Sequence, residues 1–515
     1  MPAQEQATDA LSTEHLQADL KGRSVRGGVW TIGSQGTQYV IAFVSTVVLA
    51  RILTPADFGL VAMVVAVTGF GQAFADLGLS EATIQSQEIN HNQVSTLFWV
   101  NVGIGAILTI LTICLAPVLA WFYKQPNVKE ITFVISLTFL ICGLRVQHEA
   151  LLRRQMRFSA LAFRDIVSVS AGVLVAIVMA LKGAGYWALV AQPLTMNFTQ
   201  VILTWLLVKW IPSLPRRDTK IRSMLTFGGN VAASYLIINV NRSADNALVG
   251  WYSGAGPLGL YSRAYNLLML PVRQLSAPAG AVVVPAFSRI QNDPERFARY
   301  YLRVVNLITW IAAAVFGFLF VAAKPVIALV LGPQWKGAAP VFQILAISAL
   351  AQLLLESTIW LFISQGHSKR LLKLLLIVCP VIVVSFAIGL PFGIEGVALS
   401  GSLVLLSILP WILKFSFRGT DLTLQRLGRS LLCPLSLSMM GVLVAEIALR
   451  LIQPVSTLLQ LVVVALSFAA TYLVSIVLPP VRMEIFAFKM LLSDLRPVGP
   501  IAVPATGSIE TGSGC

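Results

Sequence analysis

Long apolar runs follow one another along almost the whole chain, separated by short polar connections. A helix that spans a bilayer needs about 20 mostly apolar residues, and most of these runs are that long. We therefore predict an all-α integral membrane protein with about 14 transmembrane helices. The predicted spans, in chain order, are 27–50, 58–83, 94–121, 130–148, 162–181, 186–208, 224–250, 257–287, 303–323, 338–364, 371–390, 394–415, 430–452 and 457–479.

Basic residues alternate with these spans. With the N-terminus placed inside, 27 of the 37 Lys and Arg residues fall in the inside connections and tails, and 7 fall in the outside connections. Short cytoplasmic loops carry an excess of Lys and Arg, so this asymmetry predicts that both termini are inside. Residues 1–26 are polar, and the run that follows is too long for a signal peptide, so we interpret it as a retained first helix.

Composition narrows the class of protein. Hydrophobic residues make up 57% of the 515 residues and charged residues 11%, whereas a soluble domain has about 25% charged residues. The formal net charge of +15 does not indicate nucleic-acid binding, because the basic residues fall in short runs between apolar stretches rather than in one cluster. The five cysteines and four histidines show no ligand spacing, so we expect no metal, disulfide or cofactor.

An internal repeat divides the predicted spans. A shift of about 200 residues aligns Gly59-Leu60 with Gly259-Leu260, and in both halves a helix with polar positions leads through a short outside turn into the next helix. Both halves begin inside, which predicts a parallel repeat of two pseudo-symmetric six-helix lobes. The predicted divisions are an N-terminal tail 1–26, an N-lobe 27–209, a basic linker 210–223, a C-lobe 224–416, an extra helix pair 417–480 and a C-terminal tail 481–515.

Polar residues form stripes on the first two predicted helices. Gln35 and Gln38 lie on one stripe, and Gln72 and Asp76 lie on the other. Such groups lack partners in lipid, so the stripes should face a wet cavity or bond to neighbouring helices.

The seventh and eighth predicted spans carry three arginines, which are costly within a membrane unless they are solvated or paired. Arg242 could pair with Asp245 at i, i+3, leaving the other two for an anionic ligand, since guanidinium binds phosphate in a bidentate manner. Alternatively, Arg263 and Arg273 could extend to the two membrane surfaces. Asp76 and Asp245 are the candidates for binding a coupling ion. The candidate substrate-binding residues are Arg242, Arg263, Arg273, Asn239, Asn246, Asn266, Gln35, Gln38 and Gln72.

Motifs of catalysis are absent from the sequence. No Walker A, GxSxG or HExxH sequence occurs, and no two aspartates stand two residues apart. The sequence therefore predicts neither ATP hydrolysis nor glycosyl transfer, and we expect a protein that is not an enzyme.

Three segments carry a resemblance to a known family: ARILTPADFGL (50–60), DLGLSEATIQ (76–85) and NRSADNALVGWYSGAGPLGLYSRAYNL (241–267). Over roughly residues 22–420 the sequence resembles the Wzx-type polysaccharide flippases of the multidrug/oligosaccharidyl-lipid/polysaccharide (MOP) exporter superfamily, particularly the colanic-acid and teichuronic-acid exporters. The resemblance implies a V-shaped pair of six-helix lobes around a central cavity. It also implies that cavity arginines hold a diphosphate, with Arg242, Arg263 and Arg273 as the candidates by position, although the first predicted helix lacks a mid-span arginine.

The resemblance further implies a function at the bacterial cytoplasmic membrane. The expected activity is ion-coupled alternating access that moves an undecaprenyl-diphosphate-linked oligosaccharide to the outer leaflet for surface polysaccharide biosynthesis. The implied partners are this lipid-linked glycan, membrane lipid, and a polysaccharide polymerase with export machinery. Two alternatives stay open, a drug/cation antiporter similar to the MATE transporters and a flippase of lipid II-type peptidoglycan precursors.

Overall fold

Helices form almost all of the computed structural model, which describes residues 20–76, 78–85, 89–215 and 243–476. Within the predicted N-lobe they are α2 (Leu20–Ile52), α3 (Pro55–Asp76), α4 (Leu79–Gln85), α5 (His91–Tyr123), α6 (Asn127–Gly143), α7 (Val146–Arg154), α8 (Phe158–Leu181) and α9 (Tyr186–Val208). A helical segment, 243–253, opens the described part of the predicted C-lobe. It is followed by α11 (Ala255–Ile290), α12 (Pro294–Val321), α13 (Ala323–Val330), η2 (Pro333–Trp335), α14 (Ala338–Ser364), α15 (Ser368–Gly389), η3 (Leu390–Phe392) and α16 (Gly393–Ser416), and then by the pair α17 (Leu424–Ile452) and α18 (Thr457–Ser475).

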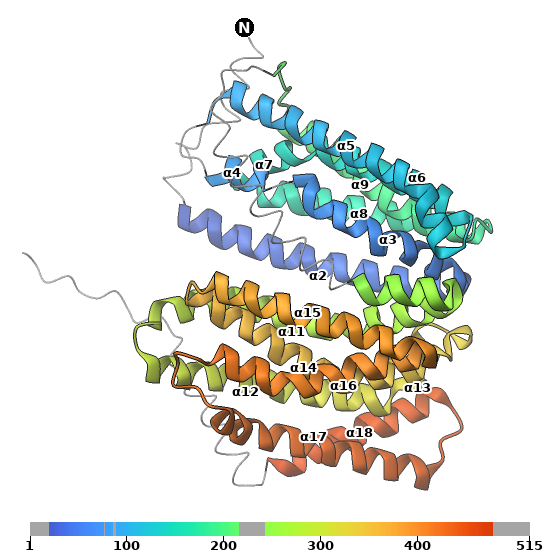
Figure 1. The fold of residues 1–515 in the computed structure, drawn as a ribbon, viewed down its shortest axis with the longest axis vertical. Helices are drawn as coiled ribbons and strands as arrows, with labels where there is room; N and C mark the ends of the chain where they lie inside the picture. Colours follow the sequence, from blue (N-terminus) through green and yellow to red (C-terminus); the bar gives the residue numbers. More distant parts are fainter. Residues whose placement is uncertain (1–19, 77, 86–88, 216–242, 477–515) are drawn as a thin grey trace, which may run out of the picture.

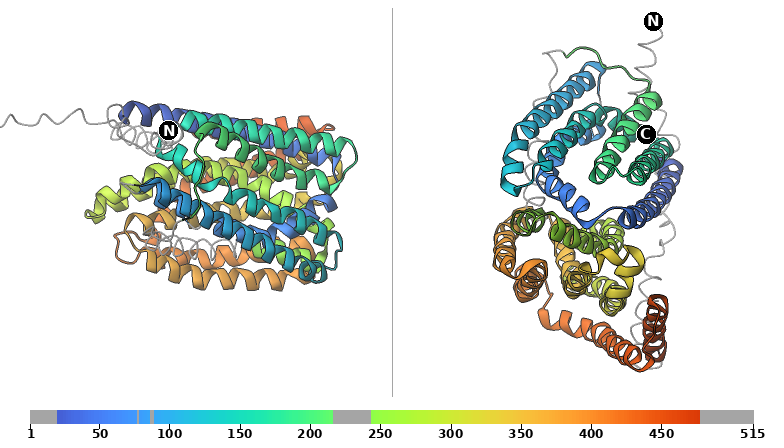
Figure 2. Two further views of the ribbon diagram at one scale, coloured as in Figure 1. Left: turned by 90° about the horizontal axis from the view of Figure 1, so that it is seen from above. Right: turned by 90° about the vertical axis from the view of Figure 1, so that its right-hand side faces the viewer.

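The helices form two bundles with a smaller pair beside the second (Figures 1 and 2). The α17–α18 pair packs on α12 and α13, on the side of the C-lobe away from the N-lobe. Among the described residues, ten helices are long and apolar enough to cross a membrane, with 368–416 counted as one. The predicted all-α membrane fold of two lobes and an extra pair is confirmed, whereas the count of fourteen and the division points stay predictions.

Local sequence signals explain where several helices begin. Asn90 and Gln93 form a capping box at the start of α5, in which each side chain accepts a hydrogen bond from the other's backbone N–H. Asp293 caps α12 by accepting from the backbone N–H of Arg296, and Pro294 occupies the first helical position.

The second predicted span, 58–83, is wrong in one respect. The α3 helix ends at Asp76 and α4 begins at Leu79, with Gly78 at φ 64° between them. This left-handed backbone favours glycine and ends the first helix, because a residue with a Cβ is strained there. The α4 helix is then held by α7, since Thr83 Oγ1 donates to Gln147 Oε1 over 2.8 Å and Arg154 Nη1 donates to the Thr83 carbonyl over 3.1 Å.

The buried cores show how the lobes meet. The largest cluster includes Leu49 and Phe58 of the N-lobe together with Tyr261 and Trp335 of the C-lobe. Further from this region, the C-lobe and the N-lobe have separate clusters around Tyr301 and Trp210, respectively. We call the shared region, with residues 49–59, 254–261 and 329–339, the gate end. The two lobes therefore share one core at the gate end and pack independently beyond it.

A close crossing of α3 and α11 joins the lobes at the gate end. A Cβ at Gly59 would collide with the Ala255 carbonyl oxygen, and one at Gly259 would collide with that of Pro55. The two contacts are related by the 200-residue shift, because Gly59 meets Ala255 and Gly259 meets Pro55. The crossing therefore has the symmetry of a twofold axis. Glycine is required at both positions because two backbones lie where a side chain would otherwise stand.

We expect Gly59→Ala to weaken the contact between the lobes. Overpacking typically costs about 1–3 kcal/mol, so the melting temperature of the purified protein should fall by several degrees. Gly69→Ala on the same helix is the matched control, because a Cβ added there would meet no atom of the described residues within 4 Å, and its melting temperature should not fall. Equal melting temperatures for the two variants would contradict the close crossing.

Candidate functional site

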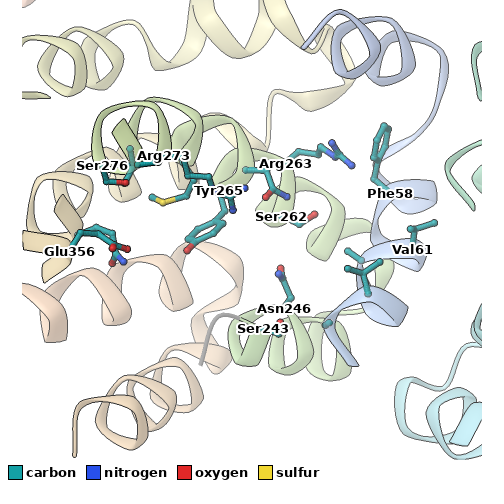
Figure 3. Close-up of a pocket in the computed structure, with 18 of the residues that line it drawn as sticks. Phe58, Val61, Ser243, Asn246, Ser262, Arg263, Tyr265, Arg273, Ser276 and Glu356 are labelled. Atoms are coloured by element: carbon teal, nitrogen blue, oxygen red, sulfur yellow. The ribbon is translucent and has the colours of Figure 1, made fainter. Parts of the chain in front are cut away.

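A cavity of about 610 Å³ lies between the lobes. It begins at Phe58, beside the α3–α11 crossing, and extends along both helices away from the gate end (Figure 3). Its walls come from α3 of the N-lobe and from segment 243–253, α11 and α14 of the C-lobe.

The two walls differ in chemistry. The lining residues that the structure describes on α3 are all apolar, namely Phe58, Val61, Ala62, Val65 and Ala66. The C-lobe wall carries the described polar side chains of the lining: Ser243, Asn246, Ser262, Arg263, Tyr265, Asn266, Arg273, Ser276, Gln352 and Glu356. A ligand in this cavity would therefore form its hydrogen bonds with the C-lobe and only apolar contacts with the described part of α3.

Arg263 lies at the gate end of the cavity, where it bridges the lobes. Its guanidinium carbon stands 4.0 Å from the centroid of the Phe58 ring, within the range of a cation–π interaction. The Nε of Arg263 and the Oδ1 of Asn246 are both buried, and neither has a hydrogen-bond partner among the described residues. A buried polar atom without a partner costs about 1–3 kcal/mol, so a ligand with an acceptor for Arg263 and a donor for Asn246 would recover that energy.

Two further polar groups of α11 stand open to the cavity. Arg273 and Asn266 are both exposed and line it. Within the described ranges neither Arg263 nor Arg273 forms an ion pair, in contrast to Arg164 of the N-lobe, which contacts Glu149 at 2.9 Å and Asp165 at 2.6 Å. The two cavity arginines thus supply positive charge that no described carboxylate neutralises by direct contact.

Hydrogen bonds between the lobes close the gate end. Trp335 Nε1 and Gln334 Nε2 both donate to the Ala50 carbonyl, over 2.8 and 2.6 Å. Arg51 Nη2 donates in return to the Leu329 carbonyl over 2.6 Å. The carbonyls of Ala50 and Leu329 lie in the last turns of α2 and α13, where helices leave carbonyl groups without internal partners. Each lobe therefore caps a helix of the other, and Trp335 also packs edge-on against Phe58 at 5.3 Å.

The structure brings together four of the predicted binding residues: Asn246, Arg263, Asn266 and Arg273 all line the cavity. Gln35 and Gln38 lie on α2 and do not line it. Asn239 and Arg242 lie outside the described residues, and so do the side chains of Gln72 and Asp76, whose backbone is in α3.

Asp245 stands next to the lining residue Asn246 but does not line the cavity itself. It is buried, and its Oδ2 accepts a hydrogen bond from the Tyr261 hydroxyl over 3.1 Å. Its Oδ1 accepts from the backbone N–H of Asn246 over 2.7 Å. These contacts link segment 243–253 to α11, which is a structural role, and the predicted ion-binding role of Asp245 stays a prediction.

Sequence reasoning missed the contribution of α14. Gln352, Glu356 and Trp360 line the cavity at spacings of four residues, so they share one face of that helix. Their four-residue spacing within the tenth predicted span, 338–364, is the sequence signal that could have indicated this polar face. Phe58 was missed because only its position opposite Arg263 gives it a role.

Comparison with solved structures defines the class of protein. The fold is similar to that of the lipid II flippase MurJ in an inward closed conformation, with a TM-score of 0.69 and 14% identity over 87% of this chain and 98% of that one. It is also similar to an inward-facing MATE family multidrug transporter of the MOP superfamily, with a TM-score of 0.57 and 16% identity over 75% of this chain and 96% of that one. The protein is therefore a multi-pass membrane protein with the MOP fold.

Comparison of sequences gives the family. Residues 48–340 match the polysaccharide biosynthesis protein family, and the chain belongs to it. Similar relatives include the lipopolysaccharide biosynthesis protein WzxC of Escherichia coli (strain K12), 24% identical over 64% of this chain and 68% of that protein. Another is the teichuronic acid biosynthesis protein TuaB of Bacillus subtilis (strain 168), 24% identical over 66% of this chain and 71% of that protein. The resemblance to Wzx-type exporters is thus confirmed.

We expect Trp335→Phe to open the gate end more often. The variant keeps the aromatic packing but loses the hydrogen bond to the Ala50 carbonyl, worth about 1 kcal/mol, so the open population should rise about fivefold. The measurement is the rate at which a cysteine placed at Asn266, in a chain without other cysteines, reacts with an impermeant thiol reagent added at the gate side.

Trp411→Phe is the matched control, because Trp411 lies in α16 and does not line the cavity. An unchanged labelling rate in the Trp335 variant would show that this bond does not hold the gate end closed.

Proposed function

We propose that the protein is a flippase that moves an undecaprenyl-diphosphate-linked oligosaccharide across the bacterial cytoplasmic membrane for surface polysaccharide biosynthesis. The observation that carries this proposal is the polar cavity between the lobes, with Arg263 at its gate end and Arg273 further along α11. Arginine binds phosphate groups through paired hydrogen bonds, so this wall suits the diphosphate of a lipid-linked sugar. Membership in the polysaccharide biosynthesis protein family supports the choice of a glycan.

The mechanism that fits this geometry is alternating access. The headgroup enters the cavity from the side away from the gate end, while the lipid tail stays in the bilayer. It is held by the C-lobe wall, and the apolar α3 wall moves past it as the lobes rock. Opening requires that the capping bonds of Ala50 and Leu329 break and that Phe58 leaves Arg263.

An ion gradient is the proposed driving force, with Asp76 and Asp245 as candidate ion-binding residues. The motif for ATP binding is absent from the sequence. A polysaccharide polymerase and export machinery are the proposed partners that receive the glycan on the outer side.

Two alternative functions fit the same fold. A drug/cation antiporter, the activity of MATE transporters, is disfavoured because the cavity arginines would repel a cationic drug. A flippase of a lipid II-type precursor is chemically close, because it too would carry a lipid diphosphate, and the fold similarity to MurJ is compatible with it.

We expect purified protein in lipid vesicles to move a fluorescent polyprenyl-diphosphate-linked sugar between leaflets. Arg263→Gln should slow this movement at least tenfold, because an ionised hydrogen bond is worth about 1.5–3 kcal/mol. Arg289→Gln, at the exposed end of the same helix and outside the cavity, is the matched control and should keep the wild-type rate. No movement by the wild-type protein would refute the substrate class.

We also propose that both termini face the cytoplasm, which places the gate end outside. A cysteine at Lys336 should then react with an impermeant maleimide in spheroplasts, and a cysteine at Arg418 should react only after permeabilisation. Both positions are exposed, so accessibility depends on the side of the membrane. The reverse pattern would invert the proposed topology.

A further inference from the structure

The cavity is longer than a diphosphate requires. A helix rises about 1.5 Å per residue, so Arg263 and Ser276 of the lining lie about 20 Å apart along α11. Arg263 occupies the gate end of this length, and Glu356 lies toward the other end, near Ser276 and Arg273 (Figure 3). The part of the cavity beyond the phosphate must therefore hold another portion of the ligand.

The α14 helix gives this far part a different chemistry from the gate end. Gln352 and Glu356 are half-buried on successive turns, and Trp360 follows one turn later. The indole of Trp360 is packed against α11 at Gly280, where a Cβ would stand 2.8 Å from its Nε1. The ring is therefore fixed in place, 6% exposed, at the edge of the cavity.

These groups suit hydroxyls better than phosphates. Glu356 lies near Arg273 and contributes negative charge, so the attraction for a phosphate is weaker here than beside Arg263. The oxygens of Glu356 accept hydrogen bonds, whereas the amide of Gln352 both donates and accepts. Sugar hydroxyls both donate and accept as well, and an aromatic side chain beside a few placed polar groups is typical of a small-molecule pocket.

We propose that Gln352, Glu356 and Trp360 form a carbohydrate subsite that binds the neutral hexose attached to the diphosphate and selects for it. This inference rests on the proposed function and names the residues that recognise its sugar. A site built to hydrogen-bond a hydroxyl discriminates strongly against a ligand without that group, because its own polar atoms are then left without partners. Glu356 should contribute most, since hydrogen bonds to an ionised group are the stronger ones.

Equilibrium binding to the purified full-length protein tests the subsite. The probes are farnesyl diphosphate, which has no sugar, and farnesyl diphosphate linked to glucose or to galactose. The titrations are done at one pH and one salt concentration without an ion gradient, so that a change in coupling cannot imitate a change in recognition. The wild-type protein should bind at least one sugar-bearing probe about tenfold more tightly than farnesyl diphosphate.

Glu356→Leu and Gln352→Leu should reduce this preference toward unity and leave the affinity for farnesyl diphosphate within about twofold of wild type. Glu446→Leu is the matched control, since it removes a half-buried carboxylate from α17, outside the cavity, and should keep the preference. Arg263→Gln should weaken all three probes by a similar factor. If Glu356→Leu does not fold, Glu356→Gln keeps the shape and should still lower the preference severalfold.

The outcomes separate the two proposals. A wild-type protein that binds all three probes equally, or α14 variants that keep the sugar preference, would overturn the subsite and leave the proposed function standing. α14 variants that weaken every probe equally would assign these residues to the phosphate instead and also overturn the subsite. If the wild-type protein binds none of the probes, the proposed function fails and the subsite fails with it.

Discussion

The close approach of α3 and α11 at Gly59 and Gly259 is the contact on which the arrangement of the lobes depends. It brings Phe58 onto Arg263 and places Trp335 of the C-lobe against Ala50 of the N-lobe. Away from this crossing the cores separate, and the cavity opens between the same two helices. Because interiors are packed densely, a contact that tolerates no added methyl group favours discrete positions of the lobes over a continuous range.

The arginines of the two lobes illustrate two uses of one side chain. Around Glu149, Arg153 at 2.8 Å and Arg164 at 2.9 Å neutralise a carboxylate and fix α7 against α8. In the cavity, Arg263 has an aromatic ring as its neighbour and a buried Nε for which the described part of the chain offers no partner. The charges around Glu149 already neutralise each other, whereas the charge of Arg263 would be stabilised by a bound anion.

The sequence is sufficient to predict the helices, the two lobes and four of the ten polar residues of the C-lobe wall. This is because segments that span lipid are apolar, so the polar residues within them stand out in the sequence. Three features escaped because they depend on tertiary neighbours. Gly78 interrupts what the sequence pattern predicts as one continuous span, 58–83. The contact of Asp245 with Tyr261, sixteen residues away, cannot be inferred from local spacing. Glu356 joins the cavity only because α14 packs against α11.

The apolar wall of α3 has a consequence for how such proteins diversify. Under the proposed function, the described part of α3 offers no hydrogen bond that could distinguish one cargo from another. A new cargo preference would then arise from substitutions in the C-lobe. The N-lobe would keep an apolar wall that contacts different cargoes equally well. A hybrid that joins this N-lobe to a relative's C-lobe should inherit its cargo from the C-lobe donor, provided that the glycines at the crossing are kept in both halves.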